Sequence, residues 1–300
     1  LFEEIRAHPV ADFLLRDCQF SGVSLSFAAL NPSTTLTWFN TLFLDSRVVL
    51  GSAAPNSRVL SLRHNLFKGG TLEVESGSQG SRVTVQDNLF DGVTFRGSPP
   101  TATAIGYNAY SSSAAWFKGP HNQVSVEVAY QTGPLGSYYY PSTLAALRHT
   151  GSQTAAAAQL FHHTTQIDQT KQDGFDDPTQ VDLGFHYAAA RDGVAWDEDQ
   201  DGLPDIEEDL NGDGRAQATE THWRKADSDG DGALDGEELT HHTDPLDAQS
   251  WFPKRLAAWW WEGPSTTWKQ GDRGQNTLPP PGTETSAPGV VGQGVAIDGS

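Results

Sequence analysis

The feature that most constrains the fold is a repeat in the first 110 residues of this 300-residue chain. Five short segments each end in an aromatic residue, and successive aromatics are separated by 23, 24, 23 and 20 residues. Apolar residues stand five positions before every aromatic, and seven positions before the first four, as in strands that bury alternate side chains. A strand repeated at this interval predicts a solenoid in which each repeat forms one coil. The five aromatic residues are Phe20, Phe43, Phe67, Phe90 and Tyr110.

A small residue able to hydrogen-bond stands two positions before each aromatic. In stacked coils, such a side chain can form a hydrogen bond with the equivalent side chain of the next coil. The hydrogen-bonding groups of both side chains are then satisfied although they are buried. We expect Asn65, Asn88 and Asn108 to form an asparagine ladder. Cys18 and Thr41 occupy the same rung as small substitutes. The pattern resembles a right-handed parallel β-helix over about residues 10–115, and a β-sandwich with coincidental spacing is the alternative.

The resemblance raises the question of catalysis, because many β-helix proteins are polysaccharide lyases or glycosidases. Strands one coil apart lie about 4.8 Å apart, so His64 and Asp87 should be neighbours, and we interpret them as a surface hydrogen bond. Asp17 and Asp87 should be roughly 14 Å apart, beyond the ~5 to 9.5 Å that glycoside hydrolysis uses. The residues just before the ladder give no convincing catalytic set: Asp17, Asn40, His64, Asp87 and Tyr107.

Negative charge is concentrated in one later segment. The formal net charge is −19, and residues 197–247 hold 18 Asp and Glu against three basic residues, which is 15 of the 19 excess negative charges. Nucleic acid is excluded as an expected partner, because its binding needs a basic face. A solvated acidic linker is the ordinary alternative for a charge run, but it predicts no fixed spacing.

The spacing in this segment is fixed. Three stretches match the calcium loop D-x-[DN]-x-[DN]-G-x5-E, with glycine at position six for the sharp bend. Calcium takes six to eight oxygens, and alternate residues of a tight turn point theirs inward, with a backbone carbonyl at position seven. The expected ligands of loop 1 are Asp197, Asp199, Asp201, Leu203, Asp205 and Glu208. Those of loop 2 are Asp209, Asn211, Asp213, Arg215, Gln217 and Glu220. Those of loop 3 are Asp227, Asp229, Asp231, Ala233, Asp235 and Glu238.

Loop 1 ends at Glu208 and loop 2 begins at Asp209, which leaves no room for the flanking helices of an EF-hand. The back-to-back spacing resembles thrombospondin type 3 repeats, and "DSDGDGALDGEELTHHTDPLD" is similar to the calcium repeats of bacterial surface proteins. A dockerin is similar at the level of the loops alone. The animal repeats carry disulfides and this segment has no cysteine, so its rigidity must come from metal. Loop 2 has the fewest carboxylates and should be the weakest site.

Residues 116–195 give fewer signals. Tyrosines at 138–140 predict one or two last strands, and "TLAALRHTGSQTAAAAQL" predicts a short helix that caps the open end of the solenoid. The stretch 181–187, "VDLGFHY", resembles the closing segment of bacterial surface β-helices that precede calcium repeats. The pairs His162–His163 and His241–His242 are interpreted as structural or exposed, because no Cys or third His is spaced to complete a zinc site.

The last 50 residues change composition again. "LAAWWWEGPSTTW" and the stretch from Gly289 to Gly299 resemble the opening of a LamG-like, concanavalin-type jelly roll. The match covers about 45 residues, roughly a third of such a fold, and an aromatic β-hairpin of another kind is the alternative. The chain contains no methionine and starts without a signal peptide, so we expect a piece of a larger protein. No apolar run of about 20 residues is present, so no transmembrane segment is expected.

The sequence therefore predicts a mainly β protein, with a right-handed parallel β-helix, a calcium-loop segment and an incomplete jelly-roll β-sandwich. The expected divisions are β-helix coils at 1–140, a cap or connector at 141–195, the calcium segment at 196–250 and the jelly-roll start at 251–300. We expect a non-catalytic extracellular structural or adhesive segment that binds Ca²⁺, with a jelly roll for carbohydrate or a cell-surface protein. The alternative is part of a secreted polysaccharide-degrading enzyme with an appended binding module.

Overall fold

The computed structural model describes residues 4–6, 12–27, 35–50, 59–74, 82–99, 104–167, 180–250, 259–260, 269–270, 284–288 and 293–297. Within these residues the chain is mainly β, with three short helices. It forms two compact units, Leu1–Lys225 and Ala226–Ser300, which are described separately. The boundaries expected after residues 140, 195 and 250 stay predictions.

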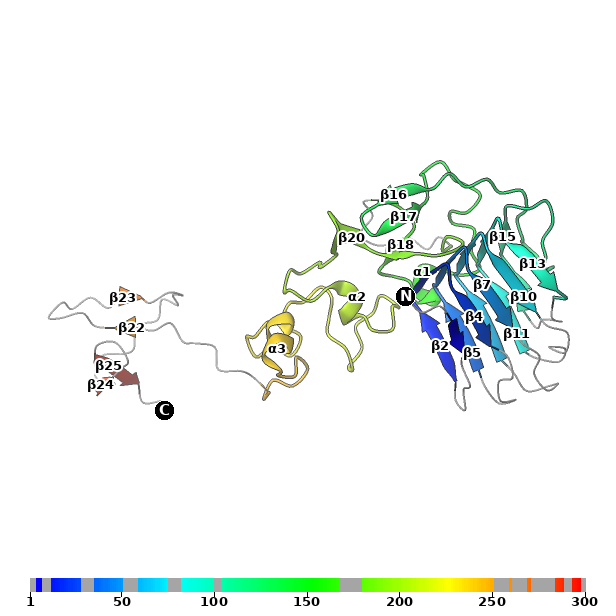
Figure 1. The fold of residues 1–300 in the computed structure, drawn as a ribbon. Coiled ribbons are helices and arrows are strands. Elements are labelled where there is room, and N and C mark those ends of the chain that lie inside the picture. The colour runs from blue at the N-terminus through cyan, green and yellow to red at the C-terminus, as the bar shows by residue number, and fades with distance from the viewer. Residues whose placement is uncertain are drawn as a thin grey trace. The chain divides into compact units, whose positions relative to one another are not determined.

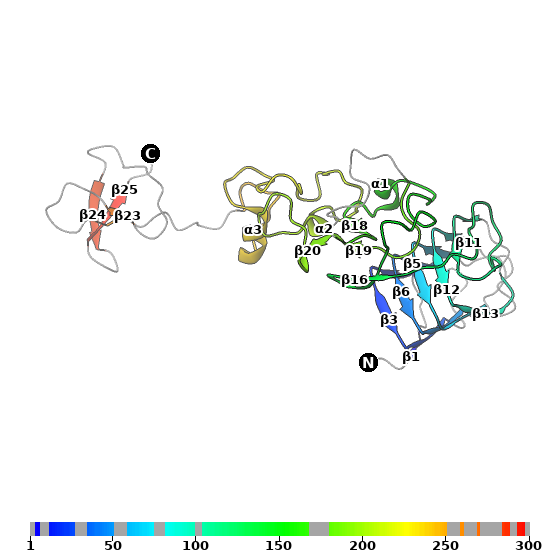
Figure 2. The same cartoon turned by 90° about the horizontal axis from the view of Figure 1, so that it is seen from above.

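Three parallel five-stranded sheets build a β-solenoid in the first unit (Figures 1 and 2). The chain visits the first, second and third sheet in turn and then starts the next coil. The first sheet contains β2 (Phe13–Arg16), β5 (Thr35–Phe39), β8 (Val59–Arg63), β11 (Arg82–Gln86) and β14 (Ala104–Gly106). The second sheet contains β3 (Gln19–Ser21), β6 (Leu42–Leu44), β9 (Leu66–Lys68), β12 (Leu89–Asp91) and β15 (Ala109–Tyr110). The third sheet contains β1 (Glu4–Arg6), β4 (Ser24–Phe27), β7 (Arg47–Leu50), β10 (Thr71–Val74) and β13 (Thr94–Gly97).

The predicted aromatic column lies inside the solenoid, in the second sheet. Each aromatic residue is the register partner of the next one along the chain, from Phe20 to Tyr110. Phe43 and Phe67 stack with ring centroids 4.7 Å apart, and Phe67 and Phe90 follow at 5.2 Å. The apolar positions of the first sheet are in register in the same way, so Trp38 lies opposite Leu62. The parallel β-helix prediction is confirmed, and the β-sandwich alternative is wrong.

The asparagine ladder is also confirmed. Asn65, Asn88 and Asn108 are completely buried. The Nδ2 of Asn65 donates to Oδ1 of Asn88 at 2.9 Å, and the Nδ2 of Asn88 donates to Oδ1 of Asn108 at the same distance. Asn122, which follows the last repeat, extends the ladder by accepting the backbone N–H of Asn108 at 3.0 Å.

A second core covers the outer face of the second sheet. Leu42, Leu66 and Leu89 each stand next to an inward-facing aromatic, so they point outward, yet all three are fully buried. Residues 126–167 and 180–187, here called the covering segment, pack on them through Tyr139 and Tyr140. This sheet is thus apolar on both faces, as is usual for a buried parallel sheet.

The covering segment contributes short elements of its own. β16 (Gln131–Gly133) and β17 (Gly136–Tyr139) form an antiparallel hairpin that is separate from the three parallel sheets. Strands are therefore present next to the tyrosines, but they are not further coils of the solenoid. β18 (His163–Thr164) pairs antiparallel with β19 (Tyr187–Ala188). A further small hairpin, β20 (Ala190–Arg191) with β21 (Val194–Ala195), leads to the acidic loops.

The only helix described before the acidic loops is α1 (Ala155–Ala158), and its predicted role as an end cap is wrong. α1 lies against the first sheet, where Ala155 and Ala158 share a small core with Phe39. The end of the solenoid is covered instead by residues 111–126, with Phe117 5.7 Å from the Phe90 ring. The reason is size, because one turn of alanines cannot fill a solenoid end that the larger Phe117 fills.

The turn between the first and second sheets has a left-handed backbone in every coil. The φ values are 53° at Asp17, 47° at Asn40, 55° at His64, 61° at Asp87 and 54° at Tyr107. The covering segment binds along this column of turns. Asn40 accepts the backbone N–H of His186 at 2.7 Å, and Asp87 accepts the N–H and hydroxyl of Ser152 at 2.7 and 2.6 Å.

The acidic segment contains the two remaining helices, α2 (Asp205–Glu208) in the first unit and α3 (Asp235–His241) in the second. Beyond it, β22 (Trp259–Trp260) pairs with β23 (Lys269–Gln270), and β24 (Glu284–Pro288) with β25 (Gln293–Ile297), both antiparallel. Most of the expected jelly-roll start, including the rest of the stretch from Gly289 to Gly299, lies outside the described residues. The jelly roll stays a prediction.

Candidate metal centre

The three acidic loops share one backbone geometry. In each loop the carboxylate at position one accepts hydrogen bonds from the backbone N–H groups of positions four and six. The distances in loop 1 are 2.6 Å from Gln200 and 3.0 Å from Gly202 to Asp197. In loop 2 they are 2.9 Å from Gly212 and 2.6 Å from Gly214 to Asp209. In loop 3 they are 2.7 Å from Gly230 and 2.9 Å from Gly232 to Asp227.

The glycine at position six has the left-handed backbone that this bend requires. Its φ is +95° at Gly202, +74° at Gly214 and +93° at Gly232, a region that glycine enters without steric cost. The carboxylate at position five then accepts the N–H of position seven, as when Asp201 accepts Leu203 at 2.6 Å. These Asx turns curl each loop around its own carboxylates.

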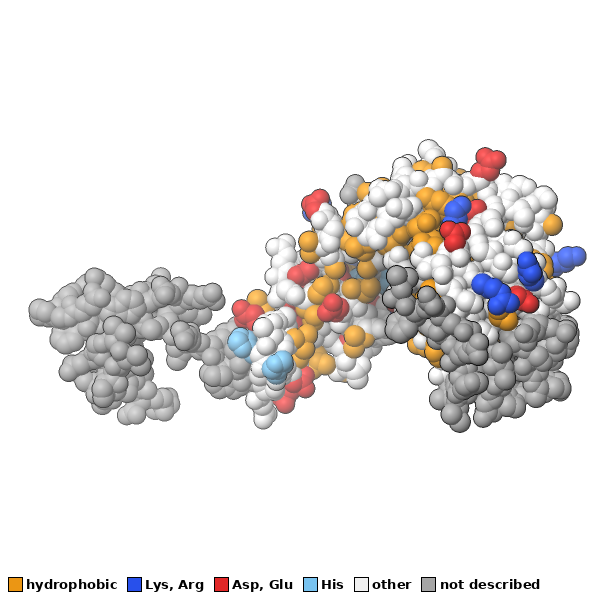
Figure 3. Space-filling model, viewed as in Figure 1, with side chains coloured by type: hydrophobic (Ala, Val, Ile, Leu, Met, Phe, Trp, Pro, Cys, Tyr) orange, Lys and Arg blue, Asp and Glu red, His pale blue; other side chains and the backbone are white. Residues whose placement is uncertain are grey.

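Loops 1 and 3 bring their first three carboxylates together. The ligand atoms of Asp197, Asp199 and Asp201 all lie within 4.8 Å of one another, and those of Asp227, Asp229 and Asp231 do the same. Among the described residues, the carboxylates of loop 2 form no such group. Figure 3 shows acidic side chains on the part of the surface that carries these loops.

Several carboxylates in these loops are wholly or partly buried. Glu238 is completely buried, and Thr243 is a hydrogen-bond partner of its carboxylate. Asp199 is partly buried and has a hydrogen bond with the backbone of Asp201. One oxygen each of Asp229 and Asp231 is buried without a hydrogen-bond partner among the described residues. A buried, unpaired carboxylate costs several kcal/mol unless a cation or hydrogen bonds compensate it. An all-oxygen donor set of this kind fits a hard divalent cation such as calcium.

The pKa values reflect the same crowding. Burial, with the nearby Asp201 carboxylate, raises the pKa of Asp199 to about 6. Burial also raises the pKa of Asp229 and of Glu238, and neighbouring carboxylates add to both shifts. Without a cation, the protein therefore disfavours the ionised form of these carboxylates. A bound divalent cation would stabilise the ionised form.

Loop 2 satisfies its side chains internally. The Nε2 of Gln217 donates to both oxygens of Asp213 at 3.0 Å, and the Nδ2 of Asn211 donates to Oε1 of Gln217 at 2.7 Å. Glu220 accepts two backbone N–H groups, from Leu210 and Gln217. A cation would have to displace some of these bonds, and the expectation that loop 2 is the weakest site stays a prediction.

Position nine begins a helix in loops 1 and 3. Asp205 at the start of α2 accepts the N–H of Glu198 at 2.7 Å, and Asp235 at the start of α3 accepts Ser228 at 2.8 Å. α2 ends at Glu208, one residue before loop 2, so loops 1 and 2 are indeed back to back. The single turn of α2 is the helix described at this junction.

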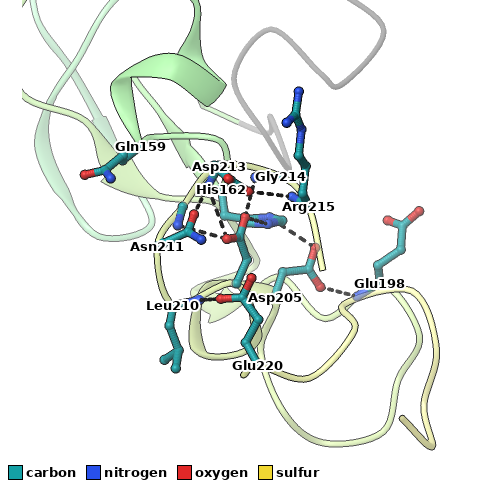
Figure 4. Close-up of polar contacts among 12 residues, drawn as sticks. Gln159, His162, Glu198, Asp205, Leu210, Asn211, Asp213, Gly214, Arg215 and Glu220 are labelled. Carbon is teal, nitrogen blue, oxygen red and sulfur yellow. Dashed lines mark hydrogen bonds and ion pairs between the residues drawn. The ribbon is translucent and has the colours of Figure 1, made fainter. Parts of the chain in front are cut away.

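One residue at this site could not be found from the spacing of the loops. His162, from the covering segment, lies between loops 1 and 2 with Nδ1 3.5 Å from Asp205 and Nε2 3.0 Å from Asp209 (Figure 4). Burial alone would lower the pKa of His162, but the two carboxylates hold it above its usual value. No local pattern predicts this contact, because 43 residues separate His162 from Asp205.

The remaining histidines are not arranged as metal ligands in the described part of the chain. His162 and His163 are buried, and His241 and His242 are exposed, which fits the structural-or-exposed interpretation. His64 and Asp87 are neighbours as predicted, with Nε2 3.7 Å from Oδ2. Their interpretation as a surface pair is wrong, because the covering segment buries both of them.

Comparison with known proteins adds one match. The bacterial TSP3 repeat family matches residues 227–248, which contain loop 3 and α3. This repeat is of the calcium-binding type and is typical of extracellular proteins, so the match suggests a calcium-binding extracellular structural role. No curated protein and no solved structure matches the chain. Among the described residues, no helix has both the length and the apolar character needed to cross a membrane.

Proposed function

We propose that this chain is a calcium-stiffened structural segment of an extracellular protein. The β-solenoid supplies a rigid body, and the three acidic loops form calcium sites that stiffen the chain after it. The expected ligands are the residues at positions one, three, five, seven, nine and twelve of each loop. The C-terminal 251–300 segment would begin a domain that binds carbohydrate or a cell-surface protein.

The observation that carries the proposal is the buried carboxylate of Glu238, which lies among the carboxylates of Asp229, Asp231 and Asp235. It lies in the segment that matches the bacterial TSP3 repeat, at position twelve, where a calcium loop places a carboxylate that uses both oxygens. Loop 1 supports the same proposal, because the ligand atoms of Asp197, Asp199 and Asp201 lie within 4.8 Å of one another. A solvated linker would leave the oxygens of Glu238 to water, so their burial favours a bound cation.

The polysaccharide-degrading alternative receives less support. The acid–base pair considered from the sequence, His64 with Asp87, is buried under Ser152 and His186 rather than open on an outer face. A polymer could not reach it without removal of the covering segment. Cleavage of pectin, alginate or a plant glucan by the purified chain would revive this alternative.

Calcium binding is tested by calorimetric titration of the whole chain with calcium chloride. We expect up to three ions per chain, with loop 2 weakest. Asp229→Asn should remove or weaken one site at least tenfold, and Asp199→Asn should do the same for another. The matched control is Glu207→Gln, an exposed carboxylate at position eleven of loop 1, which should leave all sites unchanged. No binding at millimolar calcium would defeat the proposal in favour of a solvated acidic linker.

A further inference from the structure

We infer that His162 positions the carboxylates of loops 1 and 2 and thereby couples their calcium binding to the docking of both loops on the covering segment. The inference rests on the proposed calcium function of the loops. It adds a residue that lies outside all three loop motifs.

The geometry places one imidazole between two loops. Its Nδ1 lies 3.5 Å from Oδ2 of Asp205, which is position nine of loop 1. Its Nε2 lies 3.0 Å from Oδ2 of Asp209, which is position one of loop 2. All three side chains are nearly inaccessible, with at most 4 % of their surface exposed. The contacts are therefore made away from solvent, where the attraction between opposite charges is screened less than at the surface.

Each of these carboxylates is held from two sides. The other oxygen of Asp205 accepts the N–H of Glu198 from within loop 1. The other oxygen of Asp209 accepts the N–H groups of Gly212 and Asp213 from within loop 2. His162 thus fixes the rotation of side chains whose remaining contacts belong to the loops themselves, which is how outer partners orient metal-binding groups.

The imidazole itself is held in place by aromatic neighbours. Its ring meets that of Trp223 edge to face at 5.0 Å, and the ring of Phe161 at the same distance. Phe161 also donates its backbone N–H to Gly212 of loop 2 at 3.0 Å. The carbonyl of His162 accepts the N–H of Ala189, which ties this point to the sheet of β18 and β19. Movement of loop 2 would therefore disturb the covering segment.

Loop 3 provides an internal comparison. Its position-one residue, Asp227, accepts the N–H groups of Gly230 and Gly232 in the same way. Among the described residues, Asp227 has no ion pair with a histidine. Loss of His162 should consequently affect loops 1 and 2 and spare loop 3. By thermodynamic linkage, calcium in loops 1 and 2 should in turn strengthen their docking.

The test uses His162→Phe, which keeps an aromatic ring against Trp223 and removes both nitrogens. Calcium chloride titrations are run in two backgrounds, Asp229→Asn to silence loop 3 and Asp199→Asn to silence loop 1. We expect His162→Phe to weaken calcium binding by loops 1 and 2 by about 10- to 100-fold and to leave the affinity of loop 3 unchanged. His162→Gln, which retains an amide donor, should recover part of the loss. Hydrogen exchange at Gly214 should become faster in His162→Phe at equal calcium.

The outcomes separate the inference from the proposed function. If the parent chain binds no calcium, the proposed function fails and the inference with it. If the parent binds and His162→Phe binds with unchanged affinity at every loop, the inference alone fails. An equal loss at all three loops, together with a lost β-sheet signal, would make His162 a folding residue and would also overturn the inference. If His162→Phe misfolds and His162→Gln folds, the calcium affinities of the three loops are compared between the parent and His162→Gln instead.

Discussion

Oδ1 of Asn88 accepts two hydrogen bonds from Asn65, one from the side-chain Nδ2 at 2.9 Å and one from the backbone N–H at 3.0 Å. One amide oxygen therefore satisfies both a side chain and a main-chain donor of the preceding coil. Asn88 in turn donates to the carbonyl of Leu62 at 2.9 Å. The ladder is thus part of the backbone hydrogen bonding of the solenoid.

Asn88→Leu should lower the free energy of unfolding by roughly 3 kcal/mol, since it leaves several buried groups unpaired at about 1–3 kcal/mol each. Chemical denaturation followed by circular dichroism measures the loss. The control is Thr84→Ala in the same coil, a partly exposed position where we expect a change within about 0.5 kcal/mol. Equal effects of the two substitutions would contradict a structural role for the ladder.

The outer leucines of the second sheet should matter as much as its inner aromatics. Leu66→Ala should destabilise the chain by about 2–5 kcal/mol, because Leu66 is fully buried under the covering segment. Leu14→Ala, at a strand position that is 61 % exposed, should have little effect. Limited proteolysis should also cut residues 126–147 faster in Leu66→Ala. Unchanged proteolysis would mean that this segment is held by other contacts.

Two glycines test how loop 2 packs on the covering segment. Gly214 and Gly202 both have positive φ, so alanine costs each of them roughly 1 kcal/mol of backbone strain. A Cβ at Gly214 would also lie 2.6 Å from ring atoms of Phe161, whereas a Cβ at Gly202 meets nothing within 4 Å. In excess calcium, Gly214→Ala should therefore lower the melting temperature more than Gly202→Ala. The reverse order would show that loop 2 does not rest on Phe161.

The buried column of turns predicts a loss of stability at acidic pH. Burial lowers the pKa of His64 to about 3, and burial also holds the pKa of His186 well below its usual value. Below pH 6.5 these histidines bind protons in the unfolded chain but stay neutral in the folded chain. Each of them therefore lowers the free energy of unfolding as the pH falls, by up to about 1.4 kcal/mol per pH unit. Burial raises the pKa of Asp87 to about 6, so between pH 6 and 4 its proton favours the folded state and offsets one histidine.

The measurement is the free energy of unfolding at pH 6, 5 and 4. Substitution of His64 by Gln should flatten the decline by about 1.4 kcal/mol per pH unit relative to the parent, since one titrating group is gone. The difference between variant and parent removes the contribution of the loop carboxylates, which both proteins share. Parallel curves for the two proteins would mean that His64 is protonated in the folded state.

Chelation should act on the loops and leave the solenoid intact. Without metal, the carboxylates of loop 1 repel one another, and residues 197–247 contain few apolar side chains to resist this. We expect protease to enter this segment after calcium removal, while the β-sheet signal of residues 13–110 is unchanged. Trp223, only 3 % exposed, should report the change by fluorescence. Asp201→Ala should be cut at calcium levels that protect the parent, and equal resistance with and without calcium would refute the expectation.

Local periodicity was enough to predict the solenoid. A repeat of this length places equivalent residues of successive coils next to one another. This explains the stacking of Phe67 on Phe43 and the asparagine ladder. The covering of Leu42, Leu66 and Leu89 was not predicted. Two consecutive apolar residues in four of the five repeats nevertheless break simple alternation and indicate a sheet buried on both faces. The bends of the loops were predictable because position six requires a particular backbone, which glycine supplies.

The contacts that join distant segments could not be predicted. His162 pairs with Asp205 and Asp209 only because the covering segment brings it there, and no spacing within either stretch encodes that approach. The burial of His64 has the same origin, since the ring of His186, from the covering segment, packs edge to face against it. Tertiary contacts of this kind depend on the path of the whole chain.

The covering segment also has a mechanical consequence. In the solenoid the hydrogen bonds between coils run along its axis, so tension along that axis would peel the coils away one at a time. The covering segment runs across those seams. His163 lies 3.3 Å from Asp17 near the first coil, His186 bonds to Asn40 one coil later, and Ser152 bonds to Asp87 two coils beyond. The covering segment therefore resists this separation, because a coil cannot detach until its contacts with the covering segment have also broken.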